Sequence, residues 1–395
     1  MTEDRKATGP LIFLIAGEPS GDQLGARLMA ALQEQSAEEI RFMGIGGPLM
    51  AEQGLKSLFP IEDFAVMGIF EVVPHIAKIY RRVMATIEAV QMARPAVLVT
   101  IDSPSFSLQV SKRLQGEGIP LVHYVAPSVW AWKAWRAKKI SDYLDCLLTL
   151  LPFEPPYFEA HGLRAVFVGH PVVELEEAIR EKQARPRGAC REELGLPGCD
   201  PLLCLLPGSR RGEVTRLLPI FKEVVERLQV NFPGLGVVLP TVSTVAEVLK
   251  NAVQEWRVPV KVLLGQEAKM TAYASSDLAI AASGTVAVEL AVAGLPAVIA
   301  YRVNPITAHL AKRILKIRHV SLPNILLDRE VQPELLQWDC TSKNIAAQSL
   351  SLLNEKPSRD AQIKAYEEVR GILRPGNISP SHAAAREILA LIPRN

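Results

Sequence analysis

The chain has 395 residues, which is more than one hydrophobic core comfortably serves and suits two domains of ordinary size. Its 44 lysines and arginines nearly balance its 42 aspartates and glutamates, and this formal charge of +2 argues against a general nucleic-acid binder. The five cysteines and seven histidines lack metal-ligand or disulfide spacing, so we expect a cytoplasmic protein that holds no metal.

Short apolar runs alternate with segments of helical period, which is typical of βαβ units and a parallel sheet. In the first half, the expected strands are Leu11–Ala16, Arg41–Ile45, Val97–Ile101, Leu121–Val125, Cys146–Leu150 and Val166–Val168. A helix is expected after Pro74, where apolar residues recur at helical spacing from Ile76 to Val90.

A charged segment containing proline and glycine, from about Leu175 to Gly198, predicts a boundary between domains of residues 1–175 and 176–365. Strands are expected beyond it at Leu202–Leu206, Gly236–Leu239, Lys261–Leu264, Leu278–Ala282 and Ala297–Ala300. From about Lys343 the chain is predicted to be helical, with breaks at Pro375 and Pro380. This order predicts an α/β protein with two Rossmann-like domains.

One strand-to-helix junction in the second half suits an anion. Ser283, Gly284 and Thr285 directly follow an expected strand and open an expected helix. A helix start offers free N–H groups and a positive dipole end, and Glu289 one turn further can accept hydrogen bonds from a sugar diol. An ordinary capped helix start explains the same residues.

A second such junction follows the strand Leu202–Leu206 and leads into a helix expected to start near Val214. Gly208 permits close backbone approach, Ser209 can donate a hydrogen bond, and the Arg210 guanidinium fits phosphate oxygens. The loop is not a Walker A motif, and a solvated arginine explains it as well. The two junctions together predict a nucleotide-diphosphate site in the second domain.

The first domain opens with a glycine-bearing loop that begins at Gly17 and runs to Gly25, directly after the first strand. The loop lacks the G-x-G-x-x-G order, so no dinucleotide cofactor is expected, and no cofactor is assigned. Two interpretations stay open: a tight strand-to-helix turn, or a loop that holds a second substrate's phosphate or sugar hydroxyls.

Asp102 ends the strand Val97–Ile101 and precedes Pro104, which suits the first turn of a helix. A carboxylate at a strand end is placed to take a proton from a hydroxyl, which would be worth about 10²–10⁴ in rate. Capping of the next helix is an equally good explanation.

One apolar stretch, Phe64 to Val73, is shorter than the roughly 20 residues that span a bilayer. It is either buried core or an exposed surface that receives acyl chains. Its candidate surface residues are Val66, Met67, Ile69, Phe70, Val72 and Val73. Basic and aromatic residues around Trp130–Lys139 and Leu310–Arg318 favour the membrane interpretation, although solvated helix faces explain the charges equally well.

Several of these segments together resemble the lipid-A-disaccharide synthase family of bacterial glycosyltransferases. The matching segments are Ala16–Asp22, Ala65–Val72, Ile101–Pro104, His123–Trp132, Leu206–Arg210, Ala282–Thr285, Tyr301–Arg302 and Ser321–Asn324. The Tyr-Val-Ala-Pro-Ser-Val-Trp-Ala-Trp and Ala-Val-Met-Gly-Ile segments are far more specific than a glycine motif. Relatives often differ at Pro19 and Ser103, but the acidic and glycine positions are intact.

The resemblance implies a GT-B fold, with two Rossmann-like parallel-sheet domains facing a central cleft and a C-terminal helix, about residues 366–395, crossing back to the first domain. It implies an inverting enzyme that joins UDP-2,3-diacylglucosamine to 2,3-diacylglucosamine 1-phosphate, with a β-1,6 linkage, and releases UDP. Both substrates are lipids, so the implied location is the cytoplasmic face of the inner membrane, with membrane lipids as partners. The oligomeric state stays open, with a homodimer as one outcome.

The resemblance also implies roles for individual residues. Asp102 is the favoured general base, and Arg210 and Asn324 are needed for activity. Glu18 joins them as a catalytic candidate, and the choice between Asp102 and Glu18 as the base is left open. The expected UDP-binding residues are Ser209, Arg210, Ser283, Gly284, Thr285 and Glu289. The expected cleft and acceptor residues are Ser20, Gly21, Asp22 and Arg302.

Two alternatives stay open at this point. A UDP-N-acetylglucosamine 2-epimerase shares the two-domain scaffold and a similar ribose glutamate, but it needs no lipid. A sugar-nucleotide-binding protein that docks on a membrane without catalysis would show the same loops.

Overall fold

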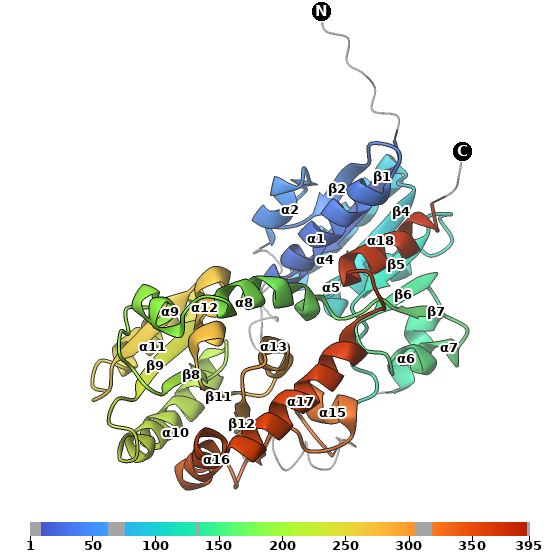
Figure 1. The fold of residues 1–395 in the computed structure, drawn as a ribbon. Helices are drawn as coiled ribbons and strands as arrows, with labels where there is room; N and C mark the ends of the chain where they lie inside the picture. Colours follow the sequence, from blue (N-terminus) through green and yellow to red (C-terminus); the bar gives the residue numbers. More distant parts are fainter. Residues whose placement is uncertain (1–8, 62–75, 132–133, 305–317, 393–395) are drawn as a thin grey trace, which may run out of the picture. The chain divides into compact units, whose positions relative to one another are not determined.

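The computed structural model describes residues 9–61, 76–131, 134–304 and 318–392, which form two compact units. Unit 1 comprises Met1–Pro171 and Leu373–Asn395, and unit 2 comprises Val172–Ile372. Each unit contains one parallel β-sheet with helices on both faces (Figure 1). The predicted α/β architecture with two Rossmann-like domains is therefore confirmed.

The sheet of unit 1 has seven strands in the order β3-β2-β1-β4-β5-β6-β7, all paired in parallel. Their bounds are β1 Leu11–Ala16, β2 Arg41–Ile45, β3 Lys56–Ser57, β4 Val97–Ile101, β5 Leu121–Tyr124, β6 Cys146–Thr149 and β7 Arg164–Phe167. The two-residue strand β3 was not predicted, because both of its residues are exposed and neither is apolar.

Helices cover both faces of this sheet. One core contains residues of α1 (Pro19–Gln35), α2 (Pro48–Glu52) and α18 (Pro380–Leu389). The other contains residues of α4 (Ile76–Ala93), α5 (Pro104–Arg113), α6 (Trp135–Ser141) and α7 (Pro155–Glu159).

The sheet of unit 2 has six strands in the order β10-β9-β8-β11-β12-β13, again all parallel. Their bounds are β8 Leu202–Leu206, β9 Gly236–Thr241, β10 Val260–Leu264, β11 Leu278–Ala281, β12 Ala297–Tyr301 and β13 Glu334–Leu336. The three-residue β13 was not predicted, since its residues are only partly buried and form no apolar run.

The helices of unit 2 also lie on two faces. The core on one face contains residues of α10 (Arg211–Gln229), α11 (Ser243–Ala252) and α16 (Ser342–Asn354). The core on the other contains residues of α8 (Glu176–Gln183), α12 (Gln266–Ser275) and α13 (Val286–Ala293). The remaining elements are η3 (Pro171–Leu175), α9 (Arg187–Glu193), α15 (Leu322–Leu327) and α17 (Lys356–Leu373). The charged segment that predicted a boundary thus forms α8 and α9, directly after the division at Pro171.

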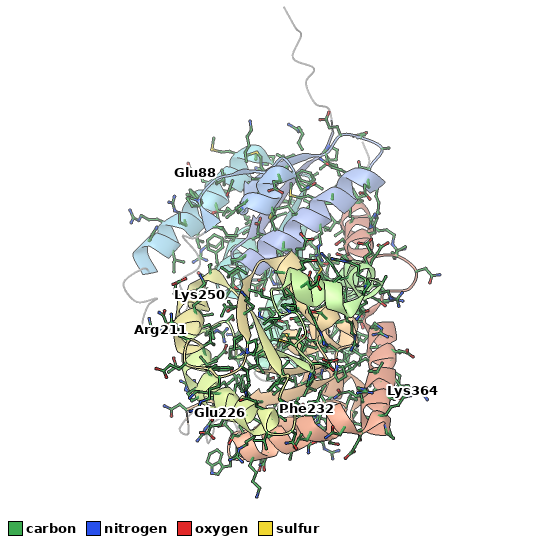
Figure 2. The ribbon with its side chains drawn as sticks, turned by 60° about the vertical axis from the view of Figure 1, so that its left-hand side comes forward. Glu88, Arg211, Glu226, Phe232, Lys250 and Lys364 are labelled. Atoms are coloured by element: carbon green, nitrogen blue, oxygen red, sulfur yellow. The ribbon has the colours of Figure 1, made fainter. Side chains whose placement is uncertain are left out.

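Charged side chains lie on the outer sides of the helices, as Glu88, Glu226 and Lys364 show (Figure 2). Among the described helices, none is both long and apolar enough to cross a bilayer. The candidate acyl surface lies outside the described residues; it comprises Val66, Met67, Ile69, Phe70, Val72 and Val73.

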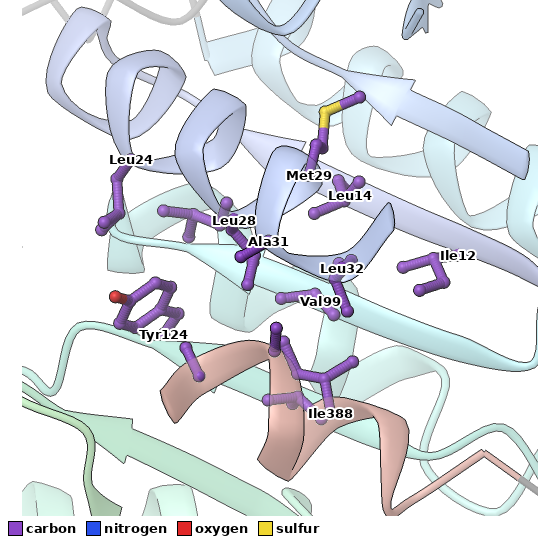
Figure 3. Close-up of a cluster of buried hydrophobic side chains, with 14 of the residues drawn as sticks. Ile12, Leu14, Leu24, Leu28, Met29, Ala31, Leu32, Val99, Tyr124 and Ile388 are labelled. Atoms are coloured by element: carbon purple, nitrogen blue, oxygen red, sulfur yellow. The ribbon is translucent and has the colours of Figure 1, made fainter. Parts of the chain in front are cut away.

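The C-terminal helix α18 belongs to the core of unit 1. Ile388 packs in the same buried cluster as Leu28 and Leu32 of α1 (Figure 3). α17 ends at Leu373, where unit 1 resumes, so the chain returns to the unit in which it began. The predicted return of the C-terminal helix is confirmed.

Asp22, predicted to contact the acceptor, has extensive bonds within unit 1. Its carboxylate accepts hydrogen bonds from the backbone N–H groups of Gly47 at 2.8 Å, Met50 at 3.0 Å and Leu49 at 3.1 Å. The side chain thereby caps α2 and ties it to α1, and the residue is only 4% exposed. Its contact with substrate stays a prediction.

We expect Asp22→Ala to lower the free energy of unfolding by about 2–3 kcal/mol, because it leaves buried N–H groups without their acceptor. Urea unfolding followed by circular dichroism measures this change, with Glu38→Ala, an exposed acid of the same unit, as the control. Equal stability of the two variants would contradict the capping role.

Candidate active site

Both groups of predicted residues lie where the strand order of a sheet reverses. In unit 1 the chain moves outward in opposite directions from β1 and β4, and in unit 2 from β8 and β11. Such switch points are where open α/β sheets bind ligands, beyond the carboxyl ends of the strands. The parallel register pairs Ala16 with Ile101 and Leu206 with Ala281, so the loops that follow are neighbours within each unit.

The loop after β8 presents the guanidinium of Arg210. Helix α10 begins at Arg211, three residues before the predicted start near Val214, and Arg210 is its N-cap. Glu213 accepts hydrogen bonds from the Arg210 backbone N–H at 3.4 Å and from its guanidinium at 3.5 Å. Because the Arg210 side chain is 68% exposed, this ion pair is weak and leaves the guanidinium available to a phosphate.

Gly208 is required in this loop. Its φ is +112°, and a Cβ there would clash with the Glu213 carboxylate. Ser209 follows it, and the Ser209 carbonyl accepts a hydrogen bond from Thr244 at 3.4 Å, which links the loop to the start of α11. The loop is thus held by α10 and α11 while Ser209 stays exposed.

The loop after β11 forms the N-terminus of α13. Thr285 is the N-cap, and Gly284 and Thr285 are exposed. Gly284 has φ +153°, which allows the backbone to turn sharply from strand to helix. Ser283 donates a hydrogen bond to the Val320 carbonyl at 3.4 Å. The N–H groups of this helix start and Arg210 together give the edge of unit 2 a positive, anion-suited character.

Glu289 lies one turn into α13 and is partly exposed, as a ribose ligand requires. One of its oxygens, Oε2, accepts hydrogen bonds from Lys269 at 3.0 Å and from Tyr273 at 2.9 Å. Both partners come from α12. Among the described residues, Glu289 Oε1 has no hydrogen-bond partner, so it is free to accept from a ligand.

Asn324 is completely buried and lies within a polar network. Its Oδ1 accepts from the N–H groups of Val331 at 2.7 Å and Gln332 at 2.8 Å, and its Nδ2 donates to Glu334 and to the Gln332 carbonyl at 2.8 Å. Glu334 also accepts from the N–H groups of Val320 and Ser321. In this structure Asn324 fixes the backbone around α15, and its role in the reaction stays a prediction.

Arg302 is exposed and follows β12, the strand beside β11. It therefore lies at the same edge of unit 2 as the anion-suited loops, rather than in unit 1 with Ser20, Gly21 and Asp22. Its contact with the acceptor stays a prediction.

The loop after β1 places Glu18 and Ser20 at the switch point of unit 1. Glu18 is the N-cap of α1, Pro19 occupies the first helical position, and Ser20 is exposed. A Cβ at Gly21 would lie 3.3 Å from Ala16 Cβ and 3.6 Å from the Ile101 carbonyl oxygen. A glycine there lets α1 begin close above the ends of β1 and β4.

Asp102 follows β4 in a strained backbone. Asp102 and Ser103 have φ values of +49° and +46°, and Val125 beyond β5 has +83°, which is unfavourable for residues with a Cβ. The Asp102 N–H donates to the Tyr124 carbonyl at 2.9 Å. Burial raises the pKa of the Asp102 carboxyl above its ordinary value, against a lowering by the Ser103 N–H. Backbone strain and perturbed pKa values are frequent at functional sites, and the role of Asp102 as the base stays a prediction.

Glu154 was not predicted, yet it holds the Trp130 loop. Its carboxylate accepts from Trp130 Nε1 at 3.3 Å and from the N–H groups of Leu150 and Leu151 at 3.2 and 3.0 Å. Trp130 also packs edge-on against Phe153, with ring centroids 5.3 Å apart. Burial raises the pKa of Glu154 to about 7, against the lowering effect of these hydrogen bonds.

The residues that were not predicted share one property: none belongs to a motif, and each acts by hydrogen bonding to a residue distant in sequence. They are Glu154, Lys269, Tyr273 and Glu334.

Among the described residues, no three His, Cys, Asp or Glu side chains lie close enough to hold a metal ion.

The family comparison matches residues 12–388 to lipid-A-disaccharide synthetase. Proteins named lipid-A-disaccharide synthase are similar over nearly their whole length. The protein from Rhodospirillum centenum is 50% identical, covering 97% of this chain and 95% of the relative. The protein from Paramagnetospirillum magneticum is 47% identical, covering 97% of each chain. The resemblance drawn from the motifs is confirmed.

Solved structures of GT-B type share the fold at low identity. UDP-GlcNAc 2-epimerase from Neisseria meningitidis, bound to UDP-GlcNAc, gives a TM-score of 0.62 at 12% identity, covering 96% of this chain and 98% of that one. MurG from Acinetobacter baumannii gives 0.57 at 15% identity, with coverages of 97% and 100%. At this level of identity, these structures establish the GT-B fold and no more.

We expect Glu154→Gln to reduce the pH dependence of stability. The folded protein holds the Glu154 proton with a pKa of about 7, against an ordinary 4.5, so its stabilising contribution is complete below about pH 4.5 and lost as pH rises through 7. The thermal midpoint between pH 5 and pH 8, followed by tryptophan fluorescence, should therefore fall less in the variant than in the wild type. Glu159→Gln, an exposed glutamate of α7, is the control, and equal slopes in all three proteins would contradict the assignment.

Proposed function

Because the chain belongs to the lipid-A-disaccharide synthetase family, we propose that it transfers the diacylglucosaminyl group of UDP-2,3-diacylglucosamine to 2,3-diacylglucosamine 1-phosphate. The products are lipid A disaccharide 1-phosphate and UDP. The observation that best supports this reaction is the chemistry of the two switch points: a cationic, N–H-rich edge in unit 2 and a partly buried carboxylate in unit 1.

Unit 2 binds the donor in this proposal. The start of α13 at Ser283, Gly284 and Thr285 and the Arg210 guanidinium receive the diphosphate, and Glu289 receives the ribose. As the bond from the sugar C1 to the diphosphate oxygen breaks, negative charge grows on UDP. Backbone N–H groups and a guanidinium stabilise that charge without reorganising at the moment of reaction.

Unit 1 binds the acceptor and supplies the base. The acceptor 6-hydroxyl oxygen forms the new bond to C1, and its proton passes to the Asp102 carboxylate. Because burial raises the pKa of Asp102, its carboxylate is a stronger base than that of an ordinary aspartate. We assign Glu18 and Ser20, which lie at the same switch point, to binding of the acceptor headgroup. Attack opposite the leaving group inverts the anomeric centre.

Both substrates carry acyl chains, and leaving a bilayer costs about 0.8 kcal/mol for each methylene exposed to water. The proposal therefore places the protein at the cytoplasmic surface of the inner membrane, with membrane lipids as partners. We assign this contact to the apolar stretch from Phe64 to Val73, on the strength of its composition. A homodimer stays open.

The test is to incubate the purified protein with both lipid substrates in mixed micelles and to follow UDP release and disaccharide formation by mass spectrometry. Asp102→Asn should reduce kcat by about 10²–10⁴-fold while UDP binding, measured by calorimetry, is retained. Asp142→Asn, an exposed aspartate of the same unit, should keep full activity. Isomerised UDP-sugar would indicate an epimerase instead, and binding without any product would indicate a non-catalytic protein.

Arg210→Ala should weaken UDP binding by about tenfold to a hundredfold, because a guanidinium–phosphate hydrogen bond contributes about 1.5–3 kcal/mol. Calorimetric titration with UDP measures the loss. Arg257→Ala is the matched control, since Arg257 is exposed and precedes β10 at the opposite edge of the same sheet. Unchanged affinity in Arg210→Ala would remove Arg210 from the diphosphate site.

A further inference from the structure

Lys269 and Tyr273 together hold the Glu289 carboxylate by hydrogen bonds. They are four residues apart on α12, so they lie on the same side of that helix. The Lys269 ammonium and the Tyr273 hydroxyl both donate to Glu289 Oε2, at 3.0 and 2.9 Å. Tyr273 is almost fully buried, whereas the Lys269 and Glu289 side chains are 25% and 20% exposed.

The two donors leave the carboxylate with one orientation and one available oxygen. A free glutamate side chain samples many rotamers, and fixing it on binding costs up to about 1.5–2 kcal/mol of conformational entropy. Here the two donors of α12 hold Oε2 before a ligand arrives, and Oε1 is the oxygen that neither of them occupies. A sugar hydroxyl is therefore met by an acceptor that is already in place.

The Lys269 charge has a second consequence. Glu289 lies one helical turn from the α13 N-terminus, where the proposal puts a diphosphate. An unpaired carboxylate there would repel that anion. Lys269 neutralises the carboxylate at 3.0 Å and so removes the repulsion without removing the hydrogen-bond acceptor.

We propose that Lys269 and Tyr273 are positioning residues for nucleotide recognition: together they hold Glu289 Oε1 toward the ribose hydroxyls, and Lys269 makes the site tolerant of the neighbouring diphosphate. This inference rests on the proposed function, because it assumes that Glu289 receives the ribose of a uridine diphosphate.

The ribose part is tested with UDP and 2′-deoxy- and 3′-deoxy-UDP, by calorimetry on the full-length chain. The wild type should prefer UDP over at least one deoxy analogue by about tenfold. Tyr273→Phe and Lys269→Met should each reduce that preference to about threefold or less. The conservative variant Lys269→Arg, which keeps the positive charge, should show the wild-type preference. A destabilised but otherwise intact site would weaken all three ligands equally, so the ratio separates positioning from folding.

The charge part is tested by comparing UDP with uridine. Lys269→Met should weaken UDP more than uridine, because it exposes the diphosphate to the Glu289 charge. Tyr273→Phe should weaken both to the same extent. Lys250→Met breaks an exposed lysine–glutamate pair on α11 of the same unit and should leave every ratio unchanged.

Glu289→Ala separates the proposed ribose contact from the proposed positioning role of Lys269 and Tyr273. If Glu289→Ala, which removes the acceptor, keeps the wild-type preference for UDP over both deoxy analogues, then Glu289 does not bind the ribose, and that part of the proposed function fails. If Glu289→Ala loses the preference but Tyr273→Phe and Lys269→Met both keep it, the ribose assignment stands and the positioning role of α12 is overturned.

Discussion

The parallel register of the two sheets is the constraint on which the candidate site depends. Every strand pair in the described chain is parallel, so all carboxyl ends within a sheet lie at one edge. Where the strand order reverses, the connections that follow the two central strands run in opposite directions along the sheet, and the loops that begin these connections are neighbours. The pairing of Ala281 with Leu206 brings the Arg210 loop to the start of α13, although the two are about 75 residues apart.

The chemistry at these edges comes from opposing charges that are only partly paired. Arg210 and the α13 N-terminus attract anions, while Glu213 and Glu289 add negative charge close by. Glu213 meets Arg210 through long, exposed contacts, whereas Glu289 is held by a buried tyrosine and a lysine. In the proposed site, a phosphate would displace Glu213 from Arg210 at little cost but would leave Glu289 in its place. Glu213 would then give way to the ligand, whereas Glu289 would stay fixed.

Much of the fold could be predicted from the sequence, because buried parallel strands are continuous apolar runs. β1, β2, β4 and β8 have the predicted bounds without change. β3 and β13 escaped prediction, since short edge strands carry polar or half-buried residues and gain their identity from pairing. The loops of the site were found for the same reason as the strands: each follows an apolar run directly.

The support of the site could not be predicted, because it depends on contacts between elements. Asp22 belongs to a glycine-bearing loop that is easily recognised in the sequence. Its hydrogen-bond donors, however, come from α2, about 25 residues further along the chain, and this contact exists only after the two segments have packed together. Lys269 looks like any solvated helix residue until α12 packs beside α13. Motifs indicate the residues that are proposed to contact a ligand, whereas the residues that orient them are determined by packing between elements.

Asn324 shows how such support can matter to chemistry without contact. It is wholly buried and its amide makes four hydrogen bonds, so loss of this one amide would leave several backbone and side-chain groups without their partner. Its partner Glu334 binds the Val320 N–H, and the Val320 carbonyl receives Ser283 of the anion-suited loop. Loss of the Asn324 donor would leave the partly buried Glu334 carboxylate with fewer hydrogen bonds and would favour rearrangement of that backbone. The position of Ser283 is thus coupled, through Val320 and Glu334, to strand β13.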